Sequence, residues 1–432
     1  MKVKFYTLGC KVNQYESQAI GESLRKRGYE IADGKENADV VIVNSCTVTA
    51  ESDRKTRQAV RRFKRQNPEG IVVLTGCMPQ AYPHKAKELL EADIVLGNKN
   101  NKELPDILES YLKYGSRAFE VKEHKTGDKF GGDTITAFEE RTRAYVKIQD
   151  GCNRFCSYCV IPYARGRVRS KPLDELKDEL KRISENGYKE VVLVGINLSS
   201  YGSDIGCSFP EAVKAANDTE GILRVRLGSL EPDHLTDKVI EELSKCEKLC
   251  PQFHISLQSG CDSTLKRMNR HYTADEYRKI ANKLRECFAD CTLTTDIMVG
   301  FAGESDADFE TSLKFMEEIA FEKVHVFPYS VRKGTRAEKL DGHLDKKIKE
   351  ERCKIMIERA EAIRRDFFKK QIGKTYGIII ESKAEDGCYM GHTANYIPVK
   401  IKTKLPDDMG GSLVNVKIIE LSDEDYLISE AE

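Results

Sequence analysis

The chain contains 432 residues, of which 40% are hydrophobic and 32% charged, and its 70 basic side chains equal its 70 acidic ones. The length predicts two or three domains, and the zero net charge excludes a bulk positive field, so any nucleic-acid partner must meet a local patch. The chain has fourteen cysteines and a polar amino-terminal sequence. This combination argues against a secreted protein held by disulfides and favours metal-bound thiolates in a reducing cytoplasm. No apolar run approaches the roughly 20 residues of a membrane helix.

The first segment repeats one theme three times: a buried apolar run, then small residues, then a cysteine. The apolar runs and the helix-like stretches between them are, in chain order, residues 3–9, 14–27, 40–45, 52–66 and 71–76. This βαβα alternation predicts an α/β fold in which an amino-terminal domain, residues 1–118, forms a doubly wound parallel sheet. The carboxyl ends of such strands share one edge of the sheet, where ligands collect.

One cysteine follows each apolar run, and these are Cys10, Cys46 and Cys77. Although they are far apart in sequence, they are expected to converge at the same edge of the sheet. Three thiolates there can hold an iron–sulfur cluster that keeps one iron position open. The alternative is three ordinary buried cysteines, since cysteine is among the most buried residue types, but their shared topological position favours a ligand set.

The helix-like stretch after Cys46 is strongly basic. It carries seven cations and no intervening acidic residue, namely Arg54, Lys55, Arg57, Arg61, Arg62, Lys64 and Arg65. This face could contact phosphates or could be a solvated surface. A short helix at 104–112 is expected to close the domain, and the Gly- and Lys-rich stretch 122–133 to link it to the next domain, with a boundary near residue 135.

Three further thiols, Cys152, Cys156 and Cys159, lie within eight residues of one another. At this spacing they can bind three of the four irons of a cubane cluster, which leaves one iron free. That open iron is what S-adenosylmethionine (SAM) chemistry requires, and the C-x-x-x-C-x-x-C pattern resembles the signature of the radical SAM superfamily. A zinc site is the alternative, but no fourth Cys or His ligand lies between residues 160 and 206.

Strand-like and helical segments alternate from residue 143 onward, which predicts an open (βα)6 barrel over residues 138–370 rather than a closed eight-stranded one. The strand-like runs are residues 143–149, 190–194, 223–227, 252–257, 292–299 and 323–327. Residues at the ends of such strands line the top of a barrel, where catalytic groups gather. The candidates are Gly195, Asn197, Ser229, Glu231, Gln258, Ser259 and Asp296. Each could instead cap a helix or satisfy a loop.

A charged amphipathic helix at 344–371 leads into a tail, residues 371–432, with β-type alternation that predicts a small β-barrel. The tail carries six basic and eleven acidic side chains, so charge alone would not hold RNA there. Local contacts could still come from Tyr389, His392, Tyr396 and Lys400, although such aromatic residues more often belong to a core.

With these parts placed, the chain resembles the methylthiotransferase family of radical SAM enzymes over nearly its whole length. The resemblance rests on the segments around Cys10, Cys46 and Cys77, on residues 151–167, 226–229 and 254–269, and on a tail similar to the family's TRAM domain. The run from Val146 to Arg169 is most similar to members that act on N6-threonylcarbamoyladenosine at position 37 of tRNA. Two positions depart from the family pattern: Ile196 stands where Gln is expected, and Ala302 where Pro is expected.

The resemblance implies two 4Fe-4S clusters and SAM as cofactors. The Cys152, Cys156 and Cys159 cluster would reduce SAM to release the 5'-deoxyadenosyl radical. The Cys10, Cys46 and Cys77 cluster would deliver a methylthio group to C2 of the adenine. The expected SAM-binding residues are Gly195, Asn197, Ser229, Gln258 and Asp296.

The resemblance also implies partners: the anticodon loop of tRNA, and an electron donor such as a flavodoxin or ferredoxin, both in the cytoplasm. Two alternatives keep the chemistry and change the target, to isopentenyladenosine 37 or to a ribosomal-protein aspartate. A third alternative, from another functional class, is a non-catalytic metal-binding module that binds RNA.

Overall fold

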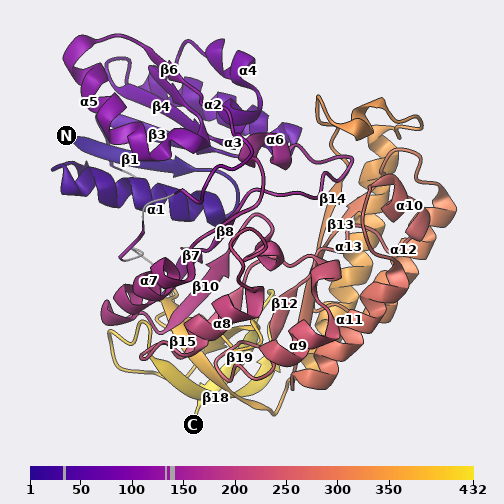
Figure 1. Cartoon of the computed structure of the whole chain (residues 1–432). Coiled ribbons are helices and arrows are strands. Elements are labelled where there is room, and N and C mark those ends of the chain that lie inside the picture. Colours follow the sequence, from indigo (N-terminus) through magenta and orange to yellow (C-terminus); the bar gives the residue numbers. More distant parts are fainter. Residues whose placement is uncertain (33–35, 132–133, 137–141) are drawn as a thin grey trace.

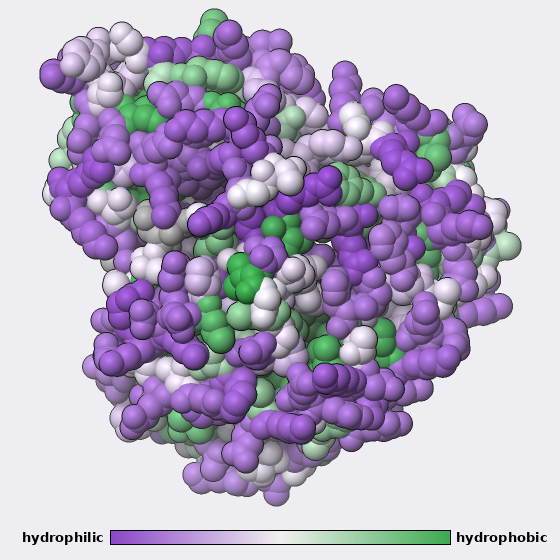
Figure 2. Space-filling view, viewed as in Figure 1, coloured by the Kyte–Doolittle hydropathy of each residue, from purple (hydrophilic) through white to green (hydrophobic). Residues whose placement is uncertain are grey.

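The computed structural model describes residues 1–32, 36–131, 134–136 and 142–432. Figure 1 shows three packed parts: an amino-terminal sheet with its helices, a central open barrel, and a small carboxy-terminal barrel beneath the central one. This architecture confirms the expected fold class. On the face shown in Figure 2, hydrophobic residues form small separate patches in a largely hydrophilic surface, as the high charged content of the chain leads one to expect.

The amino-terminal sheet has six parallel strands in the order β2-β1-β3-β4-β5-β6, a doubly wound arrangement of the flavodoxin type. The strands are β1 (Lys2–Thr7), β2 (Glu30–Ile31), β3 (Val40–Ser45), β4 (Ile71–Gly76), β5 (Ile94–Leu96) and β6 (Ala118–Glu120). The helices are α1 (Lys11–Lys26), α2 (Ala50–Gln66), α3 (Cys77–Ala81), α4 (Pro83–Lys87), η1 (Asn98–Glu103) and α5 (Leu104–Tyr114).

Alternation along β3 explains why this sheet is covered on both faces. Val40 and Ile42 pack with residues of α1 and α5, while Val43 packs on the other face with Ala59 and Val60 of α2. Successive side chains of a strand point to opposite faces, so a continuous apolar run needs two apolar layers. The unbroken apolar sequence of β3 therefore requires the double winding.

The central part is an open parallel barrel made of two three-stranded sheets, β7-β10-β11 and β12-β13-β14. Two isolated bridges, Val225 with Leu249 and Leu230 with Ile255, join the sheets. The strands are β7 (Arg143–Lys147), β10 (Glu190–Val194), β11 (Arg224–Leu227), β12 (Gln252–His254), β13 (Thr292–Val299) and β14 (Lys323–Pro328), with a short antiparallel pair β8 (Gln149–Asp150) and β9 (Arg169–Ser170).

Helices follow the barrel strands, and three of them, α8, α11 and α12, begin at capping boxes that satisfy their first backbone N–H groups. The helices are α6 (Ile161–Arg165), α7 (Leu173–Glu185), η2 (Leu198–Ser200), α8 (Phe209–Asn217), η3 (Pro232–His234), α9 (Asp237–Leu243), α10 (Asp262–Arg267), α11 (Ala274–Cys287), α12 (Asp306–Ile319), η4 (Arg336–Lys339) and α13 (Lys346–Lys369).

The carboxy-terminal strands close into a barrel in the order β15-β16-β17-β19-β18. They are β15 (Thr375–Lys383), β16 (Tyr389–His392), β17 (Pro398–Ile401), β18 (Leu413–Leu421) and β19 (Leu427–Ala431). Two arginines of β11 hold this barrel against the central one. Arg226 donates to the carbonyls of Thr393 (2.8 Å) and Ala394 (2.7 Å), and Arg224 donates to that of Gly377 (2.7 Å).

The structure differs from the sequence-based expectations mainly at element boundaries. Helix α1 begins at Lys11, directly after Cys10, and the amino-terminal sheet extends to Glu120. The described part of the expected linker is packed rather than free, because Lys122 pairs with Glu103 and the Asp128 carboxylate accepts from Lys99. The expected start of the barrel domain, residue 138, lies outside the described residues.

A buried charge pair joins the amino-terminal sheet to the barrel and generates a stability prediction. Glu179 of α7 forms an ion pair with Lys171 and accepts from Tyr15 of α1 (2.7 Å) and from the Ile135 backbone (3.1 Å). Glu179→Gln leaves a buried lysine without its counter-charge, and should lower the unfolding free energy of this region by about 3–5 kcal/mol. Calorimetric and denaturant unfolding measure the effect.

The matched control is Glu185→Gln on the same helix, which removes an exposed pair with Lys181. That change should cost less than about 1 kcal/mol. Equal effects of the two substitutions would contradict a role for Glu179 in joining the two parts.

Candidate active site

Three cysteines meet at the carboxyl edge of the amino-terminal sheet. Cys10, Cys46 and Cys77 follow the adjacent strands β1, β3 and β4, and the register sets Ser45 beside Gly76. Gly76 has a φ of +96°, and a Cβ there would lie 2.4 Å from the Ser45 carbonyl oxygen. Only glycine therefore lets the Cys77 loop approach the Cys46 loop so closely.

Each sulfur of this amino-terminal trio has a polar neighbour. Cys10 Sγ donates to Asn13 Oδ1 (3.2 Å), Cys46 Sγ accepts from the Val48 backbone (3.5 Å), and Cys77 Sγ accepts from Arg165 Nε (3.2 Å). Burial raises the pKa of Cys77 to about 12, although the Arg165 guanidinium opposes that rise. Loss of the thiol protons must therefore accompany metal binding at this trio.

The second trio, Cys152, Cys156 and Cys159, lies in the loop between β8 and α6. Burial raises the pKa of Cys152 to about 11, and burial together with the neighbouring Cys156 thiol raises the pKa of Cys159. Donors already surround these sulfurs: Arg270 Nη1 lies 3.3 Å from Cys156 Sγ, and Asn197 Nδ2 lies 3.9 Å from Cys152 Sγ. Donors to sulfur orient and stabilise metal-bound thiolates.

Among the residues that the structure describes, no three Cys, His, Asp or Glu side chains are grouped to hold a single metal ion. A cubane cluster makes a different demand, because each thiolate binds its own iron and the three sulfurs stand apart. The hydrogen-bond donors to sulfur at both trios, and the glycine-dependent approach of the Cys77 and Cys46 loops, fit such clusters.

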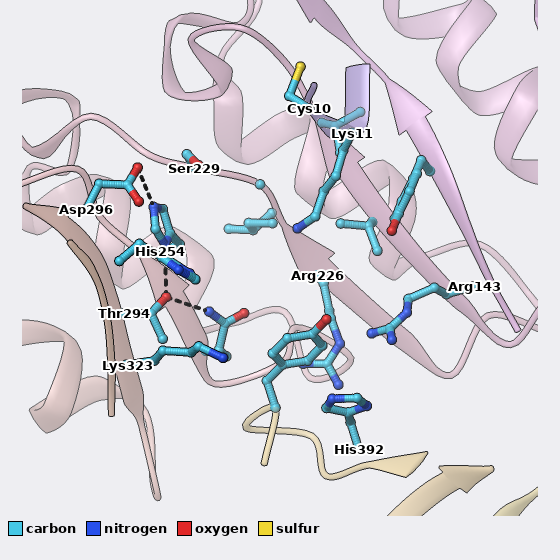
Figure 3. Close-up of a pocket in the computed structure, with 18 of the residues that line it drawn as sticks. Cys10, Lys11, Arg143, Arg226, Ser229, His254, Thr294, Asp296, Lys323 and His392 are labelled. Carbon is cyan, nitrogen blue, oxygen red and sulfur yellow. Dashed lines mark hydrogen bonds and ion pairs between the residues drawn. The ribbon is translucent and has the colours of Figure 1, made fainter. Parts of the chain in front are cut away.

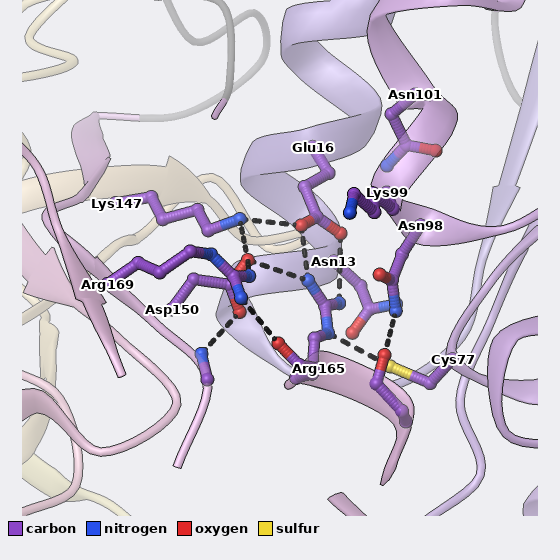
Figure 4. Close-up of polar contacts among 12 residues, drawn as sticks. Asn13, Glu16, Cys77, Asn98, Lys99, Asn101, Lys147, Asp150, Arg165 and Arg169 are labelled. Atoms are coloured by element: carbon purple, nitrogen blue, oxygen red, sulfur yellow. Dashed lines mark hydrogen bonds and ion pairs between the residues drawn. The ribbon is translucent and has the colours of Figure 1, made fainter. Parts of the chain in front are cut away.

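A buried ion network beside Cys77 joins the amino-terminal part to the barrel (Figure 4). Arg165, six residues beyond Cys159, pairs with Glu16 of α1 (Nη2–Oε2, 2.9 Å) and donates to Cys77 Sγ. Lys147 of β7 bridges Glu16 (2.8 Å) and Asp150 (2.7 Å). Burial opposes ionisation of Glu16, but Arg165 and Lys147 outweigh it, so the pKa of Glu16 lies below its usual value.

With Arg169, which lies 3.3 Å from Asp150, three cations of the network face two carboxylates. One positive charge therefore remains beside Cys77, and it favours a thiolate there.

A cavity of about 860 Å³ fills the open barrel (Figure 3). Alternate residues of the strands line it, as the two-residue period of a strand requires, and its walls also include Cys10 of the amino-terminal part and His392 and Tyr396 of the tail. The two tail rings stack 4.5 Å apart. All three parts of the chain therefore contribute to one cavity, and Cys10 is the cysteine that faces it.

One wall of the cavity is cationic. Lys11, next to Cys10, points into the space between Ser229 and Arg226 (Figure 3). Arg143 and Arg226 lie below it, and both pair with Glu190. Burial first, and then the two guanidinium groups, lower the pKa of Lys11 to about 8.

The structure brings three of the five expected SAM-binding residues into this cavity: Gly195, Ser229 and Asp296. Asn197 is buried beside Cys152. Gln258 is buried in a left-handed backbone conformation, with a φ of +65°, and lies outside the residues that line the cavity. Asp296 accepts from His254 (Nε2–Oδ2, 3.3 Å), and although burial opposes it, this contact lowers the pKa of Asp296.

Sequence reasoning missed several residues of the site: Lys11, Arg143, Arg165, His254 and Arg270. Two of them carried a signal, because Lys11 adjoins a predicted ligand and His254 lies in a predicted strand at the barrel interior. Arg165 and Arg270 carried none, since their partners lie 149 and 114 residues away in sequence.

The basic helix is less one-sided than the sequence suggested. Three of its cations have acidic partners: Arg54 with Glu51, Arg61 with Glu91 and Lys64 with Asp93. Burial lowers the pKa of Lys85. Asp53 opposes this shift, and the nearby cations Arg332, Lys333 and Arg57 add to it. We call Arg57, Lys85 and Lys333 the basic patch, whose residues come from both the amino-terminal part and the barrel.

Two family models match the chain. Residues 2–97 match the Uncharacterized protein family UPF0004, and residues 146–316 match the Radical SAM superfamily. The superfamily match implies SAM and a 4Fe-4S cluster, and the matched residues include Cys152, Cys156 and Cys159. Among the described residues, no helix is both long and apolar enough to cross a lipid bilayer.

Among solved structures, the radical SAM methyltransferase TsrM from Kitasatospora setae shares the fold, with a TM-score of 0.55 and 14% identity. That similarity covers 75% of this chain and 72% of TsrM. At this identity the likeness concerns the fold alone.

Curated relatives match over nearly the full length. The threonylcarbamoyladenosine tRNA methylthiotransferases MtaB of Bacillus subtilis and Thermotoga maritima are 36% and 38% identical, covering 97% and 100% of this chain and 94% and 97% of theirs. A tRNA-2-methylthio-N(6)-dimethylallyladenosine synthase of Clostridium botulinum is 35% identical over 96% of this chain and 93% of its own length. The chain belongs to the radical SAM methylthiotransferase family of tRNA-modifying enzymes.

Proposed function

We propose that the protein transfers a methylthio group to C2 of N6-threonylcarbamoyladenosine at position 37 of tRNA. The observation that carries the proposal is the cavity shared by all three parts of the chain, with Cys10 on one wall and three expected SAM-binding residues, Gly195, Ser229 and Asp296, also lining it. The proposal also draws on the MtaB relatives, whose names give this modified nucleoside.

The target carbon explains the need for such cofactors. An aromatic C–H at C2 of adenine offers no proton acidic enough for general-base catalysis. The cluster at Cys152, Cys156 and Cys159, together with SAM, supplies one-electron chemistry that can break this bond. The protein supplies position, charge and exclusion of water.

Within this scheme, side chains at the barrel mouth hold SAM. Asn197 lies beside Cys152 and is suited to orient the methionyl end. Gly195 lines the cavity and packs closely on Gln149, since a Cβ at position 195 would lie 2.8 Å from Gln149 Oε1. Ser229 and Asp296 face the cavity, where they can accept or donate hydrogen bonds to the nucleoside end of SAM.

Cys10, Cys46 and Cys77 would hold a second 4Fe-4S cluster that carries the sulfur, and Cys10 lines the cavity. Arg165 would balance the charge of the bound Cys77 thiolate. Each cluster has its own donors to sulfur, so the two can differ in potential.

The anticodon loop is single-stranded, and its bases can be turned out and stacked on aromatic rings. The His392 and Tyr396 stack gives such a surface inside the cavity, and the basic patch can meet loop phosphates. An electron donor such as a flavodoxin or ferredoxin would complete the reaction, in the cytoplasm where tRNA matures.

The second candidate substrate is the dimethylallyl nucleoside named for the Clostridium botulinum relatives. Its substituent is apolar, whereas the cavity here is charged and carries more basic than acidic side chains. The basic ones are Lys11, Arg143, Arg226, Lys323 and Arg364, and the acidic ones are Asp296, Glu322 and Asp425. A cationic wall favours the substituent that carries a carboxylate.

Deletion of the gene tests the proposed substrate directly. The 2-methylthio derivative of N6-threonylcarbamoyladenosine should disappear from digested tRNA, and its unmethylthiolated precursor should accumulate, as measured by nucleoside mass spectrometry. The dimethylallyl derivative serves as the internal control and should be unchanged. Unaltered threonylcarbamoyl nucleosides would refute the assignment.

Cysteine substitution tests the division between the clusters. After anaerobic reconstitution we expect about eight irons per chain, falling to about four in either Cys77→Ala or Cys156→Ala. Reductive SAM cleavage should survive in Cys77→Ala and vanish in Cys156→Ala.

Cys388→Ala, in the tail barrel, is the matched control for both measurements and should retain full iron and full cleavage. Full iron content in Cys77→Ala would remove the second cluster from the scheme.

Charge neutralisation tests the basic patch. The triple variant Arg57→Gln, Lys85→Gln and Lys333→Gln should bind tRNA more weakly, with a salt dependence shallower by about two in log–log slope, because about 0.7 counterions are released per single-strand phosphate contact. Filter binding at several salt concentrations measures both effects. Lys238→Gln with Lys245→Gln, two exposed lysines in α9 and just after it, is the control. An unchanged slope in the triple variant would exclude phosphate contact there.

A further inference from the structure

Lys11 is the first residue of α1, and its side chain projects from beside Cys10 into the cavity (Figure 3). It has accessible surface and lines the cavity. Within the described part of the chain no hydrogen bond or ion pair engages its ammonium group, although the cavity holds several other charges. An ammonium group in such a place is an open binding position for an anion.

The other cations of the cavity are already engaged. Arg143 pairs with Glu381 (2.7 Å), and Arg226 with Glu190 (2.7 Å), each also lying against the Tyr396 ring. Lys323 lies 3.7 Å from Asp425, and Arg364 pairs with Glu322 (3.0 Å). The acidic groups are likewise taken, since Asp296 accepts from His254. Lys11 is therefore the cation left for a ligand.

The position of Lys11 ties such a ligand to the reacting atoms. It follows Cys10, the cysteine that faces the cavity, and it stands on the same wall. In adenine, C2 and the N6-bearing carbon flank N1, so a substituent on N6 leaves the ring from the same edge as C2. A nucleobase that presents C2 to Cys10 therefore presents its N6 substituent to the neighbourhood of Lys11.

We propose that Lys11 binds the free carboxylate of the threonylcarbamoyl substituent and so selects this nucleoside, an inference that rests on the proposed function. The substituent is joined through the amino nitrogen of threonine, which leaves its carboxylate charged at neutral pH. An ammonium–carboxylate hydrogen bond in a partly desolvated cavity is strong, and Arg143 and Arg226 reinforce the positive field beneath it. An apolar dimethylallyl group would leave Lys11 without a counter-charge.

Two other anions could occupy the same position. The carboxylate of SAM is expected to chelate the open iron of the cluster at Cys152, and that cysteine lies outside the residues that line the cavity. A backbone phosphate is present in every RNA, whatever nucleoside stands at position 37. Both alternatives predict that substituting Lys11 does not change the difference in affinity between RNAs with and without the threonine carboxylate.

The test uses reconstituted holoenzyme and anticodon stem-loop RNAs that differ at one group. One RNA carries threonylcarbamoyladenosine at position 37, and the other carries the same nucleoside with its carboxylate converted to the neutral amide. Fluorescence anisotropy under anaerobic conditions gives the dissociation constants. Wild-type enzyme should bind the carboxylate RNA about tenfold or more tightly than the amide RNA.

Lys11→Met should abolish this difference by weakening only the carboxylate RNA, and Lys11→Arg should retain most of it. Lys26→Met, at the exposed last turn of the same helix, should behave as wild type. The comparison of two RNAs within one variant stays valid even if iron content falls, because such a loss affects both RNAs alike.

Three results would overturn the proposal. Equal weakening of both RNAs by Lys11→Met would assign Lys11 to a phosphate, a parallel loss of SAM affinity would assign it to SAM, and an unchanged preference would leave it no part in selection. Failure of the proposed function would give a different result from failure of the Lys11 proposal. In that case wild-type enzyme would cleave SAM but form no methylthiolated product on the carboxylate RNA.

Discussion

The ion network around Arg165 is the constraint on which the site depends. Arg165 is fully buried, and it holds Glu16 of the first helix while its Nε donates to Cys77. Breaking a buried network of this kind typically costs about 3–5 kcal/mol, because the remaining charge has no partner. The network therefore fixes the amino-terminal sheet on the barrel and sets the orientation of its cysteine edge.

That orientation decides what the central cavity can do. An open parallel barrel leaves its interior accessible, and here the tail covers one end of it with His392 and Tyr396 while the amino-terminal part contributes Cys10 and Lys11. The tail is acidic as a whole. It is held by carbonyls that accept from Arg224 and Arg226, and by ion pairs such as that between Arg143 and Glu381. The chemistry of a single transfer reaction can thus be divided among three folding units that meet at one space.

Charge in the cavity is arranged to leave one cation unmatched. Arginines that hold the tail also raise the positive potential beneath Lys11, so one set of side chains serves both assembly and binding. This arrangement costs electrostatic free energy, because cations enclosed in one cavity repel one another. Glu190 and Glu381 offset that cost for the arginines and leave Lys11 for a ligand.

The sequence by itself determined the parallel sheet, the six-stranded open barrel, the closed tail barrel and the positions of both cysteine trios. These features follow from local patterns. Apolar residues repeat every two residues in strands and every 3.6 residues in helices, and the cysteines from Cys152 to Cys159 have a short fixed spacing. Only the tertiary structure decided that Arg165 meets Glu16 and Cys77, that three of the seven cations of the basic helix have acidic partners, and that Lys11 faces the cavity without a partner among the described residues. Each of these depends on which segments pack together, and a side chain's partner more than 100 residues away leaves no trace in the periodicity around it.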